Sequence, residues 1–173
     1  MDTEATGRQS SRGQSRREFL QVSGAGVAGV AASIAVPPSP APAAEGRYPV
    51  VDVVAVRDVP PGSVRTFTYP DAGSPALLIR LGEAAPGGVG PSRDIVAYSA
   101  LCTHKGCTVG YKAERKLLIC PCHWSVFDPA KAGTLVIGQA SQQLPQIELR
   151  VERGMIQAVG ISGLIYGRHT NIL

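Results

Sequence analysis

Two short segments rich in cysteine and histidine constrain this chain more than any other feature. The first reads CTHKGC over residues 102–107, and the second reads CPCHWS over residues 120–125. Together they hold all four cysteines and two of the three histidines of the 173-residue chain. These side chains bind metal ions, and cysteines also form disulfides. We therefore expect the fold to bring the two segments together around a shared metal site or disulfide.

The sequence around these segments predicts an all-β domain. Short apolar runs rich in Val, Ile and Leu alternate with breaks that use many of the 20 glycines and 14 prolines. This alternation is typical of antiparallel strands joined by turns, arranged as a sandwich or barrel. The expected strands cover residues 50–56, 64–69, 76–81, 94–100, 134–138, 146–152 and 155–161, with a tight turn at 152–155 and a short helical piece near 128–133.

The first 44 residues have the composition of an export signal. Arg16 and Arg17 precede Glu-Phe-Leu, a weakly apolar run follows over residues 22–36, and a Pro/Ala segment ends at residue 44. A membrane span needs about 20 mainly apolar residues, and this run is shorter and rich in Gly, Ala and Ser. The pattern resembles a twin-arginine signal peptide. We expect residues 1–44 to direct export to the periplasm through the Tat translocase, with membrane association if the signal stays uncleaved.

The charge pattern does not favour nucleic-acid binding. The formal net charge is +4, and the basic residues are scattered along the chain. Nucleic-acid interfaces typically interleave Lys and Arg with aromatic residues, and this chain has no such run. We therefore expect no nucleic-acid partner.

Three kinds of site could use the clustered cysteines and histidines. Two structural disulfides fit an even cysteine count but give the histidines no role. A structural zinc ion takes four ligands and would leave two candidates over. A [2Fe–2S] cluster with two thiolates on one iron and two imidazoles on the other takes one cysteine and one histidine from each segment. The remaining two cysteines can then form a disulfide. This interpretation uses all six residues, although spacing alone does not say which cysteine of each segment is the ligand.

The two segments resemble the paired boxes of Rieske iron–sulfur proteins, C-T-H-x-G-C and C-P-C-H-x-S. The resemblance implies a Rieske-type β-sandwich or barrel over residues 45–173, with a small cluster-binding subdomain and one [2Fe–2S] cluster. It implies that Cys102 and Cys120 bind one iron, that His104 and His123 bind the other, and that Cys107 and Cys122 form a disulfide.

Four further residues are expected to shape or tune the cluster site. Gly106 allows a tight turn, and Pro121 stiffens the second loop. Ser125 lies where high-potential Rieske proteins place a serine that bonds a bridging sulfide. Phe127 lies where bc1-type proteins have a tyrosine that bonds a ligand sulfur. Because phenylalanine has no hydroxyl, we predict a lower reduction potential than in bc1-type proteins.

Beyond the two boxes, the chain resembles the small subunit of arsenite oxidase. The resemblance is carried by FTYPDAGSPALLIRLG at 67–82, by residues 86–107 and 120–133, and by GLIYGRHTNIL at 163–173. It implies a heterodimer with a large molybdopterin and iron–sulfur subunit that oxidises arsenite. This chain would carry no arsenite site and would pass electrons to a periplasmic c-type cytochrome or an azurin-like copper protein. The alternative is the Rieske subunit of a bc1-type quinol oxidoreductase.

Overall fold

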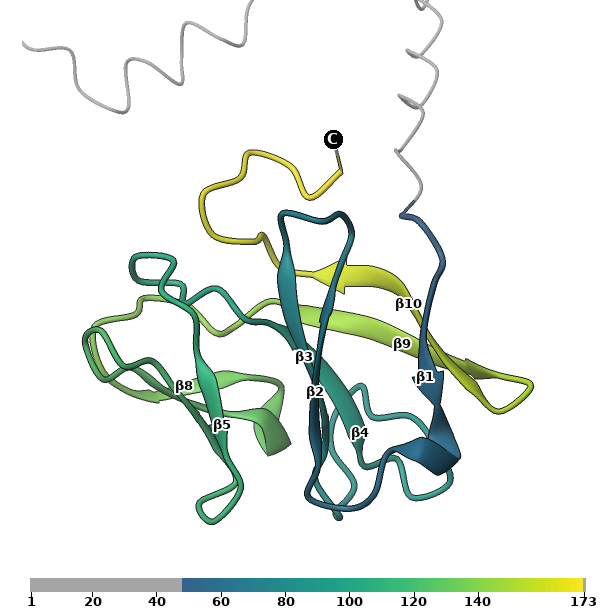
Figure 1. Cartoon of the computed structure of the whole chain (residues 1–173). Helices are drawn as coiled ribbons and strands as arrows, with labels where there is room; N and C mark the ends of the chain where they lie inside the picture. Colours follow the sequence, from purple (N-terminus) through teal and green to yellow (C-terminus); the bar gives the residue numbers. More distant parts are fainter. Residues whose placement is uncertain (1–47, 173) are drawn as a thin grey trace, which may run out of the picture. The chain divides into compact units, whose positions relative to one another are not determined.

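Hydrogen-bonded strands dominate the part of the chain that the computed structural model describes, residues 48–172 (Figure 1). The predicted signal segment, with Arg16 and Arg17, lies outside these residues. Within them, no helix is long and apolar enough to span a membrane. The elements are β1 (Val51–Ala55), η1 (Val56–Asp58), β2 (Val64–Thr68), β3 (Pro75–Arg80), β4 (Ile95–Ser99), β5 (Gly110–Lys112), β6 (Leu117–Ile119), β7 (Val126–Asp128), η2 (Pro129–Lys131), β8 (Thr134–Ile137), β9 (Gln146–Glu152) and β10 (Met155–Ser162).

The strands form two antiparallel sheets, which confirms the predicted all-β fold. The larger sheet has the order β1-β10-β9-β4-β3-β2, and the smaller sheet has the order β5-β6-β7-β8. The whole smaller sheet lies in the sequence between β4 and β9, which are hydrogen-bonded neighbours in the larger sheet. The smaller sheet is therefore a continuous insertion that leaves the larger sheet and returns to it on adjacent strands.

The central strands β3 and β4 are buried on both faces. On β3, Leu77 and Ile79 pack into one apolar cluster, whereas Ala76 and Leu78 pack into a second. Successive side chains of a strand point to opposite faces, so these strands separate two cores. The first core also contains Cys102, Cys120, Leu118 and Phe127 of the inserted segment, while β1, β9 and β10 contribute to the second.

The predicted strands are close to those observed, but β5, β6 and β7 were not predicted. Each of these three strands has only three residues, which is too short to show an alternating pattern. The predicted tight turn joins β9 to β10, where Arg153 and Gly154 both have positive φ, 50° and 79°. Two such residues are typical of a two-residue hairpin turn. The helical piece predicted near residue 130 is the short η2.

The segment that follows β10 is fixed to the larger sheet by polar side chains. Both terminal nitrogens of Arg168 donate to the Asp71 carboxylate, at 2.7 and 2.9 Å. The Asn171 amide accepts from the backbone N–H of Ile165 at 2.9 Å and donates to the carbonyl of Gly163 at 2.7 Å. These contacts close residues 163–171 into a loop beside the turn that joins β2 to β3.

Candidate metal centre

The first cysteine loop is closed by two backbone hydrogen bonds. The N–H of Cys102 donates to the carbonyl of Cys107 at 2.9 Å, and the N–H of Gly106 donates to the carbonyl of Cys102 at 2.8 Å. Gly106 has φ +72°, a left-handed conformation that glycine adopts without strain. The expected tight turn at Gly106 is therefore present, and it brings both ends of the loop together.

The second loop repeats this frame. The N–H of Cys120 donates to the carbonyl of Ser125 at 2.9 Å, and the N–H of Trp124 donates to the carbonyl of Cys120 at 3.1 Å. Trp124 takes the position that Gly106 has in the first loop and likewise has a positive φ, +58°. Each loop thus presents its first cysteine from the same backbone frame, whereas the histidine follows that cysteine by two residues in the first loop and by three in the second.

The two loops bring the four predicted ligand residues to one place. Cys102 and Cys120 are free thiols and are buried, with 1% and 2% of their surface exposed. The rings of His104 and His123 lie with centroids 4.6 Å apart and planes at 82°. His104 is half-buried and His123 is exposed. The thiols therefore face the protein interior, while the imidazoles face outward.

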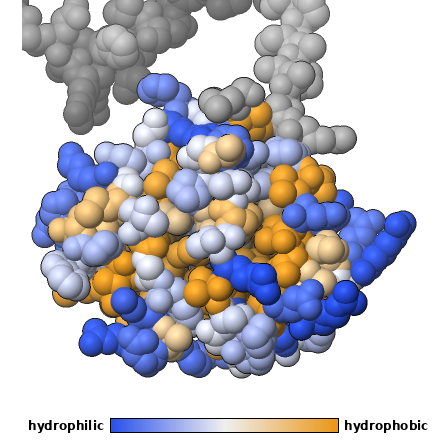
Figure 2. All heavy atoms as spheres, in the orientation of Figure 1, coloured by the Kyte–Doolittle hydropathy of each residue, from blue (hydrophilic) through white to orange (hydrophobic). Residues whose placement is uncertain are grey.

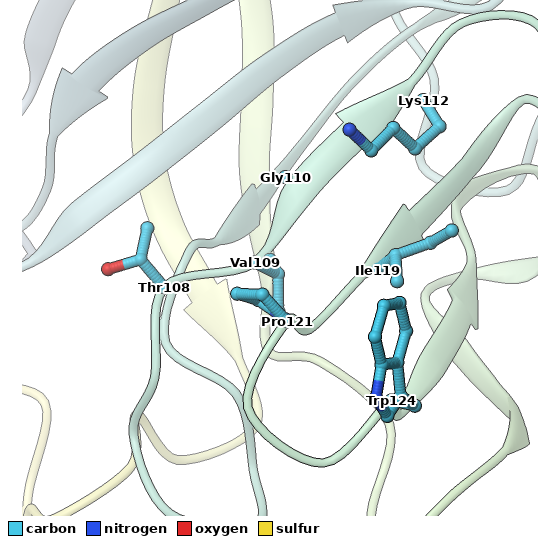
Figure 3. Close-up of a pocket in the computed structure, with 7 residues that line it drawn as sticks. All are labelled: Thr108, Val109, Gly110, Lys112, Ile119, Pro121 and Trp124. Carbon is cyan, nitrogen blue, oxygen red and sulfur yellow. The ribbon is translucent and has the colours of Figure 1, made fainter.

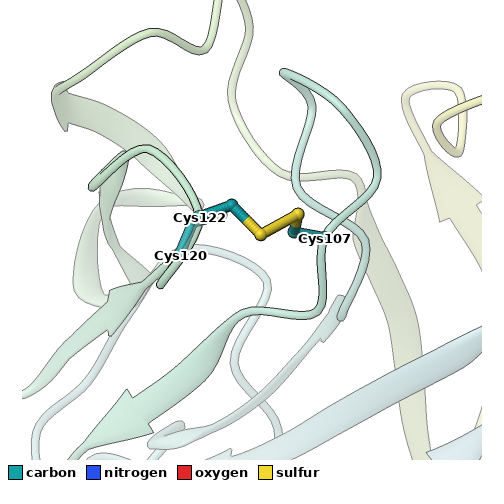
Figure 4. A group of neighbouring side chains, drawn as sticks. All are labelled: Cys107, Cys120 and Cys122. Atoms are coloured by element: carbon teal, nitrogen blue, oxygen red, sulfur yellow. A yellow bond between two sulfur atoms is a disulfide. The ribbon is translucent and has the colours of Figure 1, made fainter.

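The other two cysteines form a disulfide that joins the loops (Figure 4). Cys107 and Cys122 are bonded with a Cα–Cα distance of 6.5 Å. The sulfur atoms of Cys107, Cys120 and Cys122 lie within 4.8 Å of one another. Because two of these sulfurs are already bonded to each other, only Cys120 of the three can offer a thiolate to a metal. The structure thus has the disulfide that the resemblance implies.

Burial is the main influence on the Cys102 thiol. It raises the pKa of this group, whereas hydrogen bonds from the His104 backbone N–H and from the Ser125 side chain lower it. A thiol in this setting is neutral until a cation replaces its proton. The same two donors would then stabilise the resulting thiolate, which is the form that binds a metal.

A third segment, residues 138–144, supports both loops. The Thr103 hydroxyl donates to the carbonyl of Gln142 at 2.7 Å, and the N–H of Ala140 donates to Ser125 Oγ at 3.0 Å. A Cβ on Gly138 would overlap the Ser125 Cα, and its φ is +119°, so this position requires glycine. Ser125 itself is fully buried. The segment therefore fixes the position of the Ser125 hydroxyl.

The loop after β10 also contacts the site, through Tyr166. A Cβ added to Gly106 would lie 2.7 Å from Cδ1 of Tyr166. The Tyr166 ring therefore packs directly on the tight turn of the first loop. Gly106 serves two purposes here, since it adopts a positive φ and leaves room for this ring.

Phe127 lies next to the site in the core. It is fully buried on β7, opposite Leu118, in the apolar cluster that contains both free cysteines. Pro121 is exposed in the second loop between Cys120 and Cys122.

The donor set fits a [2Fe–2S] cluster of the Rieske type. Two buried free thiols and two adjacent imidazoles supply the sulfur and nitrogen ligands that such a cluster takes. The remaining cysteines are paired with each other and do not compete for iron. A four-ligand zinc site would use the same side chains, so relatives of the chain are informative.

Comparisons with known proteins agree with this donor set. The profile of the Rieske [2Fe-2S] domain matches residues 49–148. The iodate reductase subunit IdrB of Denitromonas iodatirespirans is 39% identical over 164 residues, which cover 91% of this chain and 86% of that protein. The cytochrome bc1 complex Rieske iron–sulfur subunit of Streptomyces lividans is 41% identical over 68 residues, or 38% of this chain and 40% of that protein.

A solved structure extends the comparison to the fold. The soluble domain of the Rieske protein II (soxF) from Sulfolobus acidocaldarius superimposes with a TM-score of 0.59 and 26% identity. The superposition covers 72% of this chain and 85% of that domain.

Proposed function

Because the chain belongs to the Rieske [2Fe-2S] domain family, we propose that it is the electron-transfer subunit of a two-subunit molybdenum oxidoreductase. The observation that carries the proposal is the 39% identity to an iodate reductase subunit along 91% of the chain. A similarity of this length includes the regions outside the cluster loops. The resemblance to the arsenite oxidase small subunit likewise extends over the domain and supports the same kind of assembly.

One [2Fe–2S] cluster is the cofactor of this family. It supplies single-electron transfer at a higher potential than clusters held by cysteine alone. In our proposal Cys102 and Cys120 bind one iron, and His104 and His123 bind the other. The hydroxyl of Ser125 and the backbone N–H of His104 orient the Cys102 sulfur, and the buried position of both thiols keeps water from them.

The proposed substrate of the partner subunit is arsenite. Oxidation of arsenite to arsenate releases an electron pair on the large subunit, and this chain would carry the electrons away singly. The acceptor would be a periplasmic c-type cytochrome or an azurin-like copper protein. Among the described residues, the one group of His, Cys, Asp or Glu side chains with metal-ligand spacing is Cys107, Cys120 and Cys122 in the two cysteine loops. In our proposal this chain transfers electrons, and the oxyanion chemistry belongs to its partner.

A second candidate substrate is iodate, because the relative with 86% coverage is named as an iodate reductase subunit. Iodate reduction consumes electrons, so electron flow through this chain would run in the opposite direction. The two candidates therefore differ in whether the oxyanion reduces or oxidises the cluster.

The test is to purify the chain with its bound partners and to follow the cluster by EPR. We expect a co-purifying molybdenum protein and a reduced Rieske signal that grows when arsenite is added to the oxidised complex. Loss of the signal from the pre-reduced complex on adding iodate would support the second candidate. Reduction by quinol alone, with no molybdenum protein present, would contradict both and support a bc1-type complex.

We also propose that residues 1–44 are a twin-arginine export signal, whether or not it is cleaved afterwards. Residues 45–173 then form the Rieske domain in the periplasm. Support comes from the paired Arg16 and Arg17 and from the apolar run that follows them. Replacing both arginines by lysine should leave the protein in the cytoplasm, as measured by cell fractionation. Unchanged periplasmic recovery of this double variant would contradict the proposal.

A further inference from the structure

We propose that the outer face of the small sheet, centred on Trp124, docks an acidic redox protein that exchanges electrons with this chain. The proposal rests on the electron-transfer role proposed above and adds the surface and the chemistry of the partner. We call this surface the docking face. It consists of Gly110, Lys112, Ile119, Trp124, Val126 and Ile137.

The fold itself does not explain why Trp124 is exposed at a position with a positive φ. It is the chain's single tryptophan, it is 71% exposed, and its φ is +58°. A bulky residue is strained in this conformation, which glycine adopts at the same position of the first loop. An exposed side chain contributes little to the core that could offset this strain. The placement is explained if the indole contacts another molecule.

The indole lies beside an open groove of about 420 Å³ (Figure 3). Val109, Gly110, Ile119 and Pro121 line it, and Lys112 lies at its rim. The lining is mainly apolar and comes from β5, from β6 and from the second cysteine loop. Such a groove suits an apolar side chain of a partner protein.

The groove continues into an apolar row across the sheet. Gly110 pairs with Ile119, Ile119 with Val126, and Val126 with Ile137. Their strand neighbours Leu118 and Phe127 point into the core, so the row points outward. Ile137 is 67% exposed and nothing in the described part of the chain covers it.

Charge determines the kind of partner. Residues 102–133 carry five basic and two acidic side chains, a net charge of +3. The other described residues, 48–101 and 134–172, carry seven of each sign and are neutral overall. Lys105 and Lys112 make no ion pair with any described residue. The excess positive charge therefore lies on the inserted segment that carries both the cysteine loops and the docking face, with Lys105 in the first loop and Lys112 at the groove, and it attracts an acidic surface.

The docking face also adjoins the proposed ligands. Trp124 directly follows His123, and Pro121 lies between Cys120 and the disulfide residue Cys122. A protein seated on this face is therefore in contact with the loop that carries the redox centre. One electron leaves this chain and enters an oxidised haem or copper centre of the docked protein, so this chain is oxidised as its partner is reduced.

The size and rim of the face favour a transient carrier over the permanent catalytic subunit. Permanent interfaces are large and have few charged residues in their core, whereas redox encounters are small. Here a narrow apolar row has the charged side chain of Lys112 at its edge. The two competing occupants of this face are the catalytic subunit and an anionic lipid surface. The experiment below distinguishes both of them from a redox carrier.

The experiment compares two forms of one probe, a lysine-rich mitochondrial cytochrome c and the same protein with its lysines succinylated, which makes it acidic. The cluster-loaded chain, in its purified complex, is reduced with ascorbate and mixed with each form by stopped flow. Binding to the oxidised chain is measured by calorimetry. We expect the acidic form to react and bind at least about tenfold better at low ionic strength. Added salt should remove this difference.

Variants then locate the surface. Lys112→Glu should lower the rate with the acidic cytochrome about tenfold, because it reverses a charge at the rim of the groove. Arg153→Glu makes the same charge change in the β9–β10 turn, which projects from the opposite side of the domain to β5 and β8 in Figure 1, and should have little effect. Trp124→Gly suits the positive φ and should weaken binding about tenfold even at high salt. An unchanged EPR spectrum of each variant shows that the cluster is intact.

Equal rates for the two cytochromes, or equal effects of Lys112→Glu and Arg153→Glu, would overturn the proposal. It would also be overturned if Lys112→Glu released the catalytic subunit or abolished binding to vesicles of anionic phospholipid without changing the cytochrome rate. Chemical reduction makes these assays independent of arsenite and iodate. Failure of an oxyanion to change the cluster signal therefore counts against the proposed function and not against the docking face.

Discussion

Gly106 and Trp124 show how much one position in each loop decides. Both follow their loop's first cysteine by four residues, donate an N–H to its carbonyl and have positive φ. Gly106 is packed against Tyr166, so any side chain there meets an aromatic ring. Trp124 has solvent beside it instead. The same backbone requirement therefore selects glycine where the loop is covered and tolerates tryptophan where it is open.

At Ser125, we predict that replacement by alanine lowers both stability and reduction potential. The hydroxyl accepts from the Ala140 N–H at 3.0 Å and is fully buried, so its loss leaves an unpaired donor. This should cost about 1–3 kcal/mol of unfolding free energy. The potential should fall because a hydrogen bond to the Cys102 sulfur is lost. Denaturant unfolding and voltammetry measure the two effects, with the exposed Ser141→Ala as control. An unchanged potential would contradict the tuning role.

At Phe127, we predict that tyrosine raises the midpoint potential. The side chain is fully buried in the cluster of apolar residues that includes Cys102 and Cys120. We expect a hydroxyl added there to reach a ligand sulfur, and such a bond stabilises the reduced centre. Phe67→Tyr makes the same change at a half-buried position packed against the other core and should leave the potential unchanged. A value for Phe127→Tyr equal to or below that of the wild type in voltammetry would refute this account.

At the scale of elements, the loop after β10 depends on the ion pair between Arg168 and Asp71. Hydrogen bonds from Arg168 hold the pKa of the Asp71 carboxyl below its ordinary value of 3.8. The pair therefore stabilises the fold above that pH, and its contribution is lost as pH falls through the lowered pKa. Arg168→Gln should lower the unfolding free energy by about 1 kcal/mol at neutral pH, because the pair is partly exposed.

The wild type and this variant should converge in stability as the pH falls through the lowered pKa, as measured by thermal unfolding across pH. Arg57→Gln, in exposed η1, provides a control with no expected effect. A difference that persists unchanged at acidic pH would show that Arg168 acts through packing and not through its charge.

At the same scale, the disulfide links the two cysteine loops covalently. Cys107 and Cys122 are 15 residues apart in the sequence, and closing a loop of this length stabilises a fold by about 3 kcal/mol. The double variant Cys107→Ala, Cys122→Ala should therefore unfold at a lower temperature and lose its cluster faster, followed by visible absorbance. If the absorbance decays at the wild-type rate, the loops are held by their backbone frames alone.

Sequence patterns predicted the longer strands and missed the three short strands that lie between the cysteine loops and beside them. The strands from β1 to β4 and from β8 to β10 have enough residues for apolar periodicity and clear turn residues between them. The strands β5 to β7 have three residues each and lie between cysteines, where local pattern carries no signal. The six cysteine and histidine positions were evident, but their roles came from resemblance. The contact of Tyr166 with Gly106 joins residues 60 positions apart, and no local pattern could reveal it.

At the scale of the whole molecule, two cores share the wall formed by β3 and β4, but only one of them adjoins the cluster. Leu118 is fully buried in the core with both free cysteines, and Leu78 is fully buried in the other. Each change to alanine should cost about 2–5 kcal/mol of unfolding free energy. Leu118→Ala should also speed cluster loss under native conditions, whereas Leu78→Ala should not. Equal rates of absorbance decay for the two variants would indicate that the cores act as one unit.

The insertion of the small sheet between two adjacent strands has a consequence for how redox proteins can diversify. The segment from the end of β4 to the start of β9 carries every proposed iron ligand, the disulfide and the docking face, and its ends lie on neighbouring strands. The scaffold can therefore accept another such segment without changing its own strand order. We expect an exchange of this single stretch between relatives to transfer cofactor properties and carrier preference together, as one heritable cassette.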